Sequence, residues 1–391
     1  MSLQGAPLWV LLFIINAGAI AATVVLWQRL AGRGPLRVLA RIGMIVLCQL
    51  TVVLLLAVSA NNYFYLYGTW ADVFGGPSNV DIISGSQPVP GPLVGGYDGR
   101  MTEVALQGST TGLTGRGFVY LPPQYHDPRY ANTRFPVLVM LTGYPGEALS
   151  LVRRLEVPSR LQTENAAGRM QPMIVVMLAS ALTPPRNTEC IDVPGGPQTG
   201  TYFTRDLVDI VTTQYRALSP PHSWTIMGVS TGGYCAVKLS MMHPRVYSQA
   251  VSLSGHYHAI TGQMTGDLYR DAHTKALNDP LWRLAHLPAP PISVLVTASQ
   301  TDPSVYKETK KFVDSVKAPM AVSHAMLATG GHSFETWAAE LPAVLDWIGQ
   351  HTVQPSSHPV KAPKTPVSPD SVKIVLKHTG TGRTASRASK P

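Results

Sequence analysis

Two long apolar runs open the chain, and shorter apolar segments of changing period follow them. Residues 8–27 contain no charged side chain, and residues 42–60 form a second uncharged run. Each run has about the 20 residues that a helix needs to cross the roughly 30 Å hydrocarbon core of a bilayer. We therefore predict a membrane hairpin over residues 1–62, with transmembrane helices at about 8–27 and 42–60.

Charges around these runs predict the orientation of the hairpin. Four basic side chains lie in or beside the short connection: Arg29, Arg33, Arg37 and Arg41. No acidic residue precedes Asp72. The positive-inside rule places such a connection in the cytoplasm, so the N-terminus and everything after residue 60 are expected outside. A secretory signal peptide is the competing interpretation of the first run, but it requires a basic N-terminal segment, and MSLQGAP has none.

Two regions of the chain have compositions typical of linkers and tails. Residues 63–100 are rich in Gly, Pro and Ser without a sustained period, which predicts a linker or arm. Its beginning overlaps the aromatic stretch 61–70, which we expect at the outer membrane interface. Residues 351–391 combine Pro, Ser, Thr and Lys with one short apolar island. That composition predicts a disordered basic tail.

Between residues 101 and 350, short apolar segments alternate with helical patterns. Segments 102–108 and 117–123 flank a glycine-rich turn and predict a hairpin. Six continuous apolar runs predict buried strands: 135–141, 173–180, 223–229, 250–255, 292–299 and 320–328. Helical spacing occurs at 202–218, 234–243, 304–317 and 333–350. This order predicts an α/β domain with a mostly parallel central sheet and helices on both faces.

The net charge of +9 suggests nucleic-acid binding until it is divided along the chain. Residues 1–60 carry +4 and residues 352–391 carry +6, which leaves −1 for residues 61–351. The central domain therefore has no basic balance that would attract nucleic acid. We expect the tail charge to favour an anionic wall polymer as its partner.

Three cysteines are too few for a disulfide framework. Cys48 lies in the second apolar run, whereas Cys190 and Cys235 fall in the region predicted to be outside, where disulfides form. The sequence leaves open whether these two are bridged or are buried free thiols. No residues have metal-ligand spacing, so we expect neither a metal nor another cofactor.

The segment Gly228–Gly232 has the pattern G-x-S-x-G between a predicted strand and a predicted helix. This context defines a nucleophile elbow, in which a tight turn needs glycine on both sides of the serine. The turn presents Ser230 at a helix N-terminus, where free N–H groups favour developing negative charge. We interpret Ser230 as the candidate nucleophile; a plain glycine-rich turn is the alternative.

A serine nucleophile needs a base, and the base needs a third group that orients it. In the α/β-hydrolase fold these follow in the order Ser, acid, His. Asp302 comes after the strand at 292–299 and His332 after the strand at 320–328, at the sheet edge where ligand sites gather. We predict a triad of Ser230, Asp302 and His332. Capping of the next helix is the other interpretation of Asp302.

Other acidic residues and histidines compete for these roles. Asp267 and Asp271 lie in a stretch, 266–273, that we predict to be helical rather than at a strand end. His256 and His258, which flank Tyr257, precede the acid in the chain. We therefore predict that these three residues line the substrate pocket, with ordinary loop histidines as the alternative.

An acyl-transfer site also needs donors for an oxyanion. The backbone N–H of Thr231, directly after the nucleophile, is the first candidate. The loop after the strand at 135–141 supplies the second, the N–H of Tyr144, with Gly143 opening the turn. We expect Gly143 and the Tyr144 ring to form part of the pocket.

Five segments together resemble the putative esterase family, the branch of α/β-hydrolases that holds esterase D and the secreted mycobacterial mycolyltransferases. They are GFVYLPPQY, FPVLVMLTGYPGE, GVSTGG, TASQTD and GGHSFETWAAELPAVLDWI. The resemblance covers about 101–350. It implies a Ser-Asp-His triad acting on ester or thioester bonds without a cofactor. TGYPG replaces the His-Gly pair of many relatives, and the acid is Asp where the mycolyltransferases use Glu.

These features predict a serine esterase anchored in the cell membrane by two helices, with its catalytic domain outside, similar to actinobacterial envelope proteins. The expected partner is an ester- or acyl-bearing small molecule or an envelope lipid. An acyltransferase that delivers the acyl group to a sugar or lipid hydroxyl is the alternative within the enzyme class. A catalytically silent module that binds the envelope is the alternative outside it.

Overall fold

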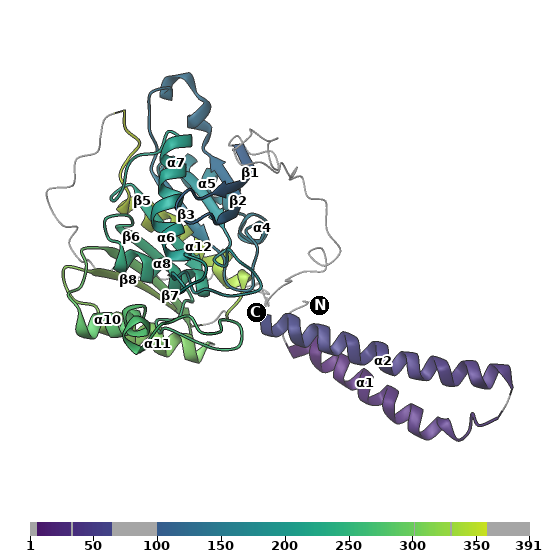
Figure 1. Ribbon diagram of the computed structural model, residues 1–391. Coiled ribbons are helices and arrows are strands. Elements are labelled where there is room, and N and C mark those ends of the chain that lie inside the picture. Colours follow the sequence, from purple (N-terminus) through teal and green to yellow (C-terminus); the bar gives the residue numbers. More distant parts are fainter. Residues whose placement is uncertain (1–5, 33, 65–99, 301, 329–330, 358–391) are drawn as a thin grey trace, which may run out of the picture.

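The computed structural model describes residues 6–32, 34–64, 100–300, 302–328 and 331–357 (Figure 1). The predicted linker at 63–100 and the predicted tail at 351–391 lie mostly outside the described residues, as does most of the aromatic stretch 61–70. For these segments the sequence-based expectations remain predictions.

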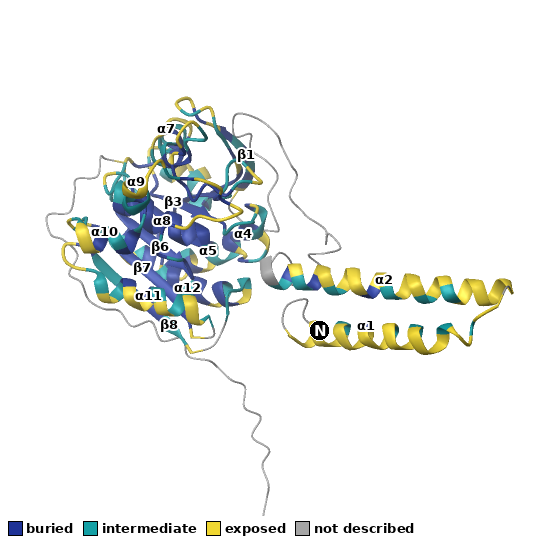
Figure 2. Ribbon diagram, turned by 60° about the horizontal axis from the view of Figure 1, so that its bottom comes forward, coloured by how far each residue is buried: buried dark blue, intermediate teal, exposed yellow. Residues whose placement is uncertain are grey.

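Two apolar helices form the N-terminal hairpin, α1 (Ala6–Trp27) and α2 (Pro35–Phe64). Both are long and apolar enough to cross a membrane. They run side by side in opposite directions, and most of their apolar side chains are exposed (Figures 1 and 2). Helix α2 begins before the uncharged run at 42–60, because Pro35 fits the first turn of a helix and no later residue interrupts the pattern.

Polar side chains join the two helices at several levels. Asn16 Nδ2 donates to Thr51 Oγ1 over 2.9 Å, and both residues are buried between the helices. Trp9 Nε1 donates to Ser59 Oγ over 2.8 Å nearer the open end of the hairpin. These bonds satisfy polar groups that would be costly to expose to hydrocarbon.

An eight-stranded sheet forms the centre of the second part of the chain, in the order β1-β2-β4-β3-β5-β6-β7-β8. The strands are β1 (Arg100–Gln107), β2 (Thr114–Leu121), β3 (Val137–Leu141), β4 (Ile174–Leu178), β5 (Trp224–Val229), β6 (Gln249–Leu253), β7 (Ser293–Ser299) and β8 (Ala321–Leu327). Strand β2 pairs antiparallel with β1 and β4, and all other pairs are parallel. The predicted entry hairpin and mostly parallel sheet are confirmed.

Helices cover both faces of this sheet (Figure 1). One face packs against α7 (Leu207–Gln214), α8 (Thr231–Met242), α10 (Pro280–His286) and α11 (Pro303–Ser315). The other packs against α4 (Leu149–Arg153), α5 (Val157–Ala166) and α12 (Phe334–His351). Alternate residues of β3 belong to the two cores, as the period of two in a strand requires. Because both faces are covered, the central strands read as continuous apolar runs.

Shorter helical segments complete the domain. They are the 3-10 turns η1 (Pro123–His126) and η2 (Pro128–Tyr130), the single turn α6 (Thr199–Thr201), the π-helical turn η3 (Tyr202–Asp206) and α9 (Ala272–Leu277). The predicted helix at 202–218 therefore begins at Thr199 and ends at Gln214, where Tyr215 becomes extended.

Two sequence-based expectations need correction. Most of the stretch 266–273 is not helical, because helix α9 begins only at Ala272, with the side chain of Asp271 capping it through the N–H of Thr274. The domain also continues past residue 350. Arg134 and Ser356 exchange two backbone hydrogen bonds of 3.0 Å, and Thr352 is buried, so residues 351–357 belong to the folded domain rather than to a disordered tail.

Candidate active site

Ser230 lies in the tight turn between β5 and α8, with φ 54° and ψ −121°. Few residues other than glycine adopt a positive φ, so the surrounding structure must hold this conformation in place. The flanking glycines allow the turn to close. A Cβ on Gly228 would lie 2.3 Å from the carbonyl carbon of Gly232, and one on Gly232 would lie 2.5 Å from the oxygen of Leu141.

His332 connects the serine to an acid. Its Nε2 lies 2.9 Å from Oγ of Ser230, and its Nδ1 lies 2.9 Å from Oδ2 of Asp302. The three residues follow β5, β7 and β8, so parallel pairing brings their carboxyl ends to one edge of the sheet. A neutral imidazole with its proton on Nδ1 donates to the carboxylate and accepts the serine proton at Nε2.

Asp302 has three hydrogen-bond partners, and its two carboxylate oxygens accept from all of them. Its Oδ1 accepts hydrogen bonds from Ser304 Oγ at 3.1 Å and from the N–H of Val305 at 3.4 Å, which caps helix α11. The hydrogen bond from His332 is the main reason that the pKa of Asp302 is lowered from its ordinary value. The carboxylate is therefore ionised at neutral pH, as an orienting group for a histidine must be.

The loop after β3 lies directly against the serine. A Cβ on Gly143 would come within 3.1 Å of Ser230 Cβ, so a side chain at this position would press on Ser230. Tyr144 follows, and its hydroxyl donates to the carbonyl oxygen of Pro185. Within the described residues, neither the N–H of Tyr144 nor that of Thr231 donates to a protein acceptor. Both residues line the cavity at the serine.

Ser230 and His332 open into a cavity of about 730 Å³, a size typical of small-molecule sites. Its lining includes several side chains that the sequence analysis did not identify: Leu149, Ile260, Met264, Phe334 and Trp337, together with the charged Glu147, Arg153 and Arg154. They come from separate loops and helix ends. No local pattern distinguishes them from other loop residues, so sequence reasoning had no signal for them.

Two aromatic residues of α12 shape the side of the cavity near His332. Trp337 packs edge-on against the His332 ring at 5.2 Å, and its Nε1 donates to Ser254 Oγ over 3.1 Å. Phe334 packs edge-on against Trp337. The guanidinium of Arg154 lies over the Phe334 ring, 4.2 Å from the ring centre. Because Trp337 is almost fully buried, it restricts the positions that the histidine ring can adopt.

The prediction that His256, Tyr257 and His258 line the pocket is wrong. His256 stacks on Tyr234 at 4.4 Å and its Nε2 lies 3.0 Å from Oε2 of the buried Glu189. Tyr257 is fully buried and stacks on Phe312. His258 Nδ1 lies 3.0 Å from Oδ2 of Asp279, and none of the three residues 256–258 borders the cavity. Their place near the strand end was foreseen, but packing turns the side chains of His256 and Tyr257 toward the neighbouring helices.

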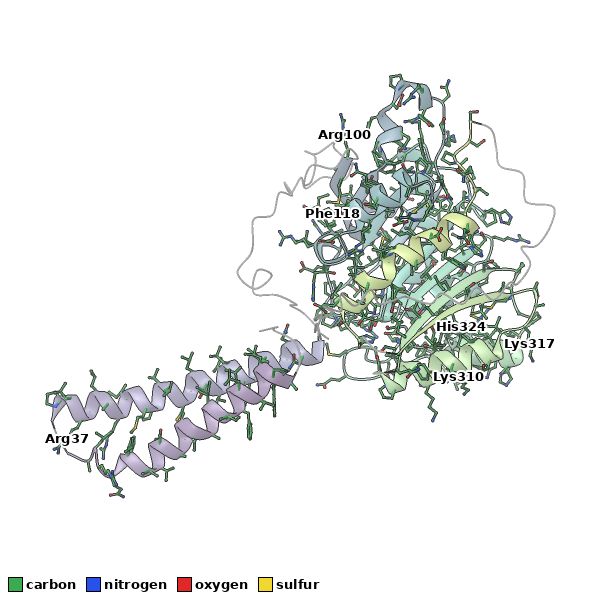
Figure 3. All side chains as sticks on the ribbon, turned by 180° about the vertical axis from the view of Figure 1, so that it is seen from behind. Arg37, Arg100, Phe118, Lys310, Lys317 and His324 are labelled. Carbon is green, nitrogen blue, oxygen red and sulfur yellow. A yellow bond between two sulfur atoms is a disulfide. The ribbon has the colours of Figure 1, made fainter. Side chains whose placement is uncertain are left out.

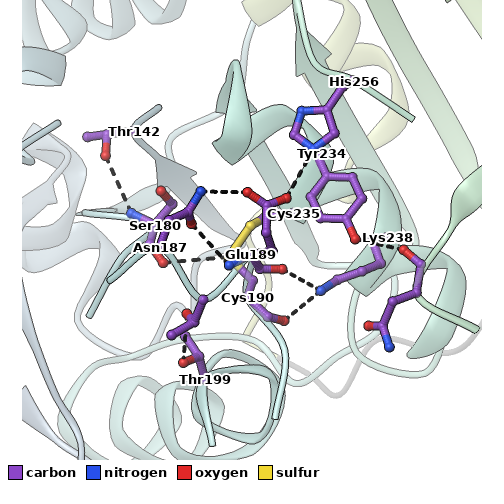
Figure 4. The surroundings of a disulfide bond; sticks show 12 residues. Thr142, Ser180, Asn187, Glu189, Cys190, Thr199, Tyr234, Cys235, Lys238 and His256 are labelled. Atoms are coloured by element: carbon purple, nitrogen blue, oxygen red, sulfur yellow. Dashed lines mark hydrogen bonds and ion pairs between the residues drawn. A yellow bond between two sulfur atoms is a disulfide. The ribbon is translucent and has the colours of Figure 1, made fainter. Parts of the chain in front are cut away.

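Cys190 and Cys235 form a disulfide, with Cα atoms 5.7 Å apart (Figure 4). The bond joins helix α8, which begins directly after Ser230, to the loop between β4 and α6. A buried polar network surrounds it (Figure 4). Glu189 Oε1 accepts a hydrogen bond from Asn187 Nδ2, and Glu189 Oε2 pairs with His256. Lys238 Nζ donates to the carbonyl oxygens of Glu189 and Cys190. Complete burial lowers the pKa of Lys238 to about 7.

The same loop supports the wall of the cavity. The N–H of Asn187 donates to the carbonyl oxygen of Met264 over 3.0 Å, and Arg186 Nε donates to that of Thr265 over 2.8 Å. The carbonyl of Pro185 accepts from Tyr144. The disulfide therefore fixes a segment that holds two further loops around Ser230.

Comparison with known proteins agrees with this fold. The profile described as putative esterase matches residues 109–348. An uncharacterized protein of Corynebacterium glutamicum is 26% identical over 269 residues, which are 64% of this chain and 62% of that protein. The chain therefore matches less than two thirds of that relative's length.

Solved structures of esterases and hydrolases share the fold at low sequence identity. An S-formylglutathione hydrolase from Agrobacterium tumefaciens has a TM-score of 0.55 at 15% identity, covering 68% of this chain and 99% of that one. A ferulic acid esterase has a TM-score of 0.54 at 17% identity, covering 65% and 98%. A fluorophosphonate-binding serine hydrolase of Staphylococcus aureus has a TM-score of 0.51 at 15% identity, covering 64% and 98%.

Proposed function

Because this chain belongs to the putative esterase family, whose profile spans most of its α/β domain, we propose that it is a serine ester hydrolase that uses Ser230, His332 and Asp302. Family and fold support an ester hydrolase. The observation that carries the assignment of residues is the pair of 2.9 Å contacts that His332 makes, one to Ser230 Oγ and one to Asp302 Oδ2.

In the proposed reaction, His332 Nε2 accepts the proton of Ser230 as Oγ attacks the ester carbonyl. Asp302 keeps the ring in the required tautomer and stabilises the imidazolium that forms. The imidazolium then protonates the departing alcohol, which leaves an acyl group on Ser230. Water attacks this acyl-enzyme with His332 again as the base, and releases the acid and the free serine.

We propose the N–H groups of Tyr144 and Thr231 as the oxyanion donors. Their lack of protein acceptors within the described residues supports this role, because an unpaired amide beside the nucleophile is available to a developing negative charge. Thr231 is also the first residue of α8, where the helix dipole adds to the effect. The close approach of Gly143 to Ser230 brings the loop near enough for the second donor.

We also propose that α1 and α2 anchor the protein in the cell membrane, with the catalytic domain outside. Their length, their exposed apolar side chains and the polar contacts between them support insertion into a bilayer. The arginines near the connection support a cytoplasmic turn. The disulfide supports an oxidising compartment for the domain.

Labelling with a fluorophosphonate tests the proposed nucleophile. Wild-type protein should be modified covalently, Ser230→Ala should not, and Ser315→Ala on α11 should be labelled as wild type. A folded wild-type protein that remains unlabelled would mean that the fold serves binding rather than catalysis. On intact cells, a probe that cannot cross the membrane should label the protein only if the domain faces outward.

A further inference from the structure

Two exposed apolar side chains lie at the edge of the cavity. Among the described residues after α2, Ile260 and Met264 are the only large apolar side chains classed as exposed, at 42% and 46% of their surface. Both belong to the loop between β6 and α9, and both line the cavity that contains Ser230. Single exposed apolar residues are ordinary. Here, however, the domain exposes two large ones, and both lie in the lining of the cavity that contains Ser230. We call this pair the apolar lip.

Hydrogen bonds hold the loop that carries the lip. The N–H of Gly266 donates to the carbonyl oxygen of Gly262 over 2.8 Å. The hydroxyl of Thr265, which is buried, accepts a hydrogen bond from the N–H of Gly262. Asn187 and Arg186 bind the carbonyl oxygens of Met264 and Thr265 from the disulfide-linked loop. With Thr265 directed inward, Met264 is held outward, so its exposure follows from the fold of the turn.

The size of the lip limits what it can bind. Stable protein partners bury about 800 Å² on each side, which two side chains cannot supply. A bilayer needs no complementary surface, because a few apolar side chains can enter the interfacial region directly. Three charged residues line the same cavity: Glu147, Arg153 and Arg154. Arg154 pairs with Glu335 over 3.4 Å, and the remaining two carry opposite charges, so the cavity gives no clear preference for a charged partner.

The length of the segment between α2 and β1 limits how far the domain can lie from a bilayer that holds the hairpin. Segment 65–99 connects α2 to β1, and a chain of this length spans at most roughly 120 Å. If α1 and α2 cross a membrane, the domain stays within that distance of its surface. Tethering of this kind turns a weak contact into a frequently occupied one.

We propose that the apolar lip docks on the bilayer in which the hairpin is anchored, so that Ser230 takes its substrate from the lipid phase. The substrate class is an ester with a long apolar chain that resides in the membrane. This inference rests on the proposed function and anchoring, and it changes only how the ester reaches the serine.

The full-length protein in phosphatidylcholine vesicles allows the test. Hydrolysis of 4-nitrophenyl acetate in solution is compared with hydrolysis of 4-nitrophenyl palmitate incorporated in the same vesicles. For Ile260→Ser/Met264→Ser, the ratio of the palmitate rate to the acetate rate should fall at least tenfold relative to wild type. Gln263→Ser, in the same loop, is the matched control, and its ratio should change less than twofold. An unchanged ratio in the double variant, including one in which both rates fall by the same factor, would overturn the proposal.

Direct contact is measured separately from catalysis. In a Cys48→Ser background, a fluorophore attached at Met264→Cys should be quenched by lipids that carry a nitroxide in the acyl chain. The same label at Lys310→Cys, on α11 (Figure 3), should not be quenched. Equal quenching at the two sites, or none at residue 264, would refute docking.

Two further outcomes have separate meanings. If wild type hydrolyses neither ester, the proposed function fails, while the quenching experiment still decides on docking. If the label at residue 264 is not quenched by the lipids, and the double variant changes the oligomeric state measured by sedimentation, the lip binds a second copy of the chain. That outcome overturns the proposal.

Discussion

The carboxylate of Asp302 holds His332 with one oxygen and caps a helix with the other. Oδ2 lies 2.9 Å from Nδ1 of His332, and Oδ1 accepts from the N–H of Val305 at the start of α11. The two interpretations that the sequence left open are therefore compatible, and the dual contact allows the two contributions to be separated experimentally.

Asp302→Asn should lower kcat strongly while preserving the fold. Asparagine caps helices about as well as aspartate, so the melting temperature should change by only a few degrees. The amide cannot stabilise the imidazolium, and in serine proteases the equivalent change lowers kcat by about 10⁴. We expect a loss of roughly 10³ to 10⁴ with an activated ester. A variant with nearly normal kcat would exclude Asp302 as the orienting acid.

The contribution of Asp302 to the stability of the domain should depend on pH. The hydrogen bond from His332 is the main reason that the pKa of this carboxyl is lowered, so it stays ionised over the neutral range. Its stabilising effect should be fully present above the ordinary carboxyl pKa and lost only as the pH falls through the lowered value. The free energy of unfolding of wild type and Asp302→Asn, compared at neutral and at acidic pH, tests this. A difference between the two proteins that is the same at both pH values would contradict it.

Gly143→Ala should impair catalysis more than stability. The added methyl group would lie 3.1 Å from Ser230 Cβ, tighter than ordinary contacts, so the nucleophile or the loop must shift. A displacement of this kind can cost two orders of magnitude in rate; we expect at least a tenfold loss of kcat. At Gly262 a Cβ would meet no atom within 4 Å, so Gly262→Ala should show a far smaller loss. Equal effects of the two substitutions would contradict this explanation.

Removal of the disulfide should weaken both the fold and the site. Cys190 and Cys235 are separated by 45 residues, and closing a loop of that length stabilises a fold by about 4 kcal/mol in the chain-entropy model. The double Cys→Ser variant should lose a comparable free energy of unfolding in denaturant titrations. Its kcat should also fall, because the freed loop supports Tyr144 and Met264. Cys48→Ser serves as the control, and wild-type behaviour of the double variant would argue against a supporting role.

Glu340 should make the stability of the domain depend on pH. Its side chain is buried on α12 and receives a hydrogen bond from Thr297 Oγ1, and burial raises its pKa to about 7. Between about pH 4.5 and 7, the folded state keeps the proton of Glu340 while the unfolded state releases it. The contribution of the protonated Glu340 to the free energy of unfolding is therefore lost as the pH rises through 7. At one pKa unit per 1.36 kcal/mol, the loss is about 3 kcal/mol.

Glu340→Gln replaces the carboxyl with an amide that does not titrate, so it should remove most of the pH dependence of the free energy of unfolding. The free energy of unfolding, measured at pH 5 and pH 8 for both proteins, gives the comparison. If the free energy of unfolding changes by the same amount between pH 5 and pH 8 in wild type and variant, Glu340 does not titrate in this range.

Much of the architecture could be predicted from the sequence because it depends on local patterns. The continuous apolar runs identified the buried strands, and the order of strands and helices fixed the mostly parallel sheet. The G-x-S-x-G turn located Ser230. Parallel strands place their carboxyl ends at one edge, so Asp302 and His332 could be assigned from their positions after two strands.

Features that depend on contacts between distant segments were decided only by the tertiary structure. The pairing of Cys190 with Cys235 needed a Cα separation of 5.7 Å, which no spacing in the chain encodes. His256 and Tyr257 follow a strand, as expected of pocket residues, yet packing directs them into the neighbouring layers. The exposure of Ile260 and Met264 has the same origin. Whether a side chain is buried is set by the sum of its neighbours in space, and those neighbours come from elsewhere in the sequence.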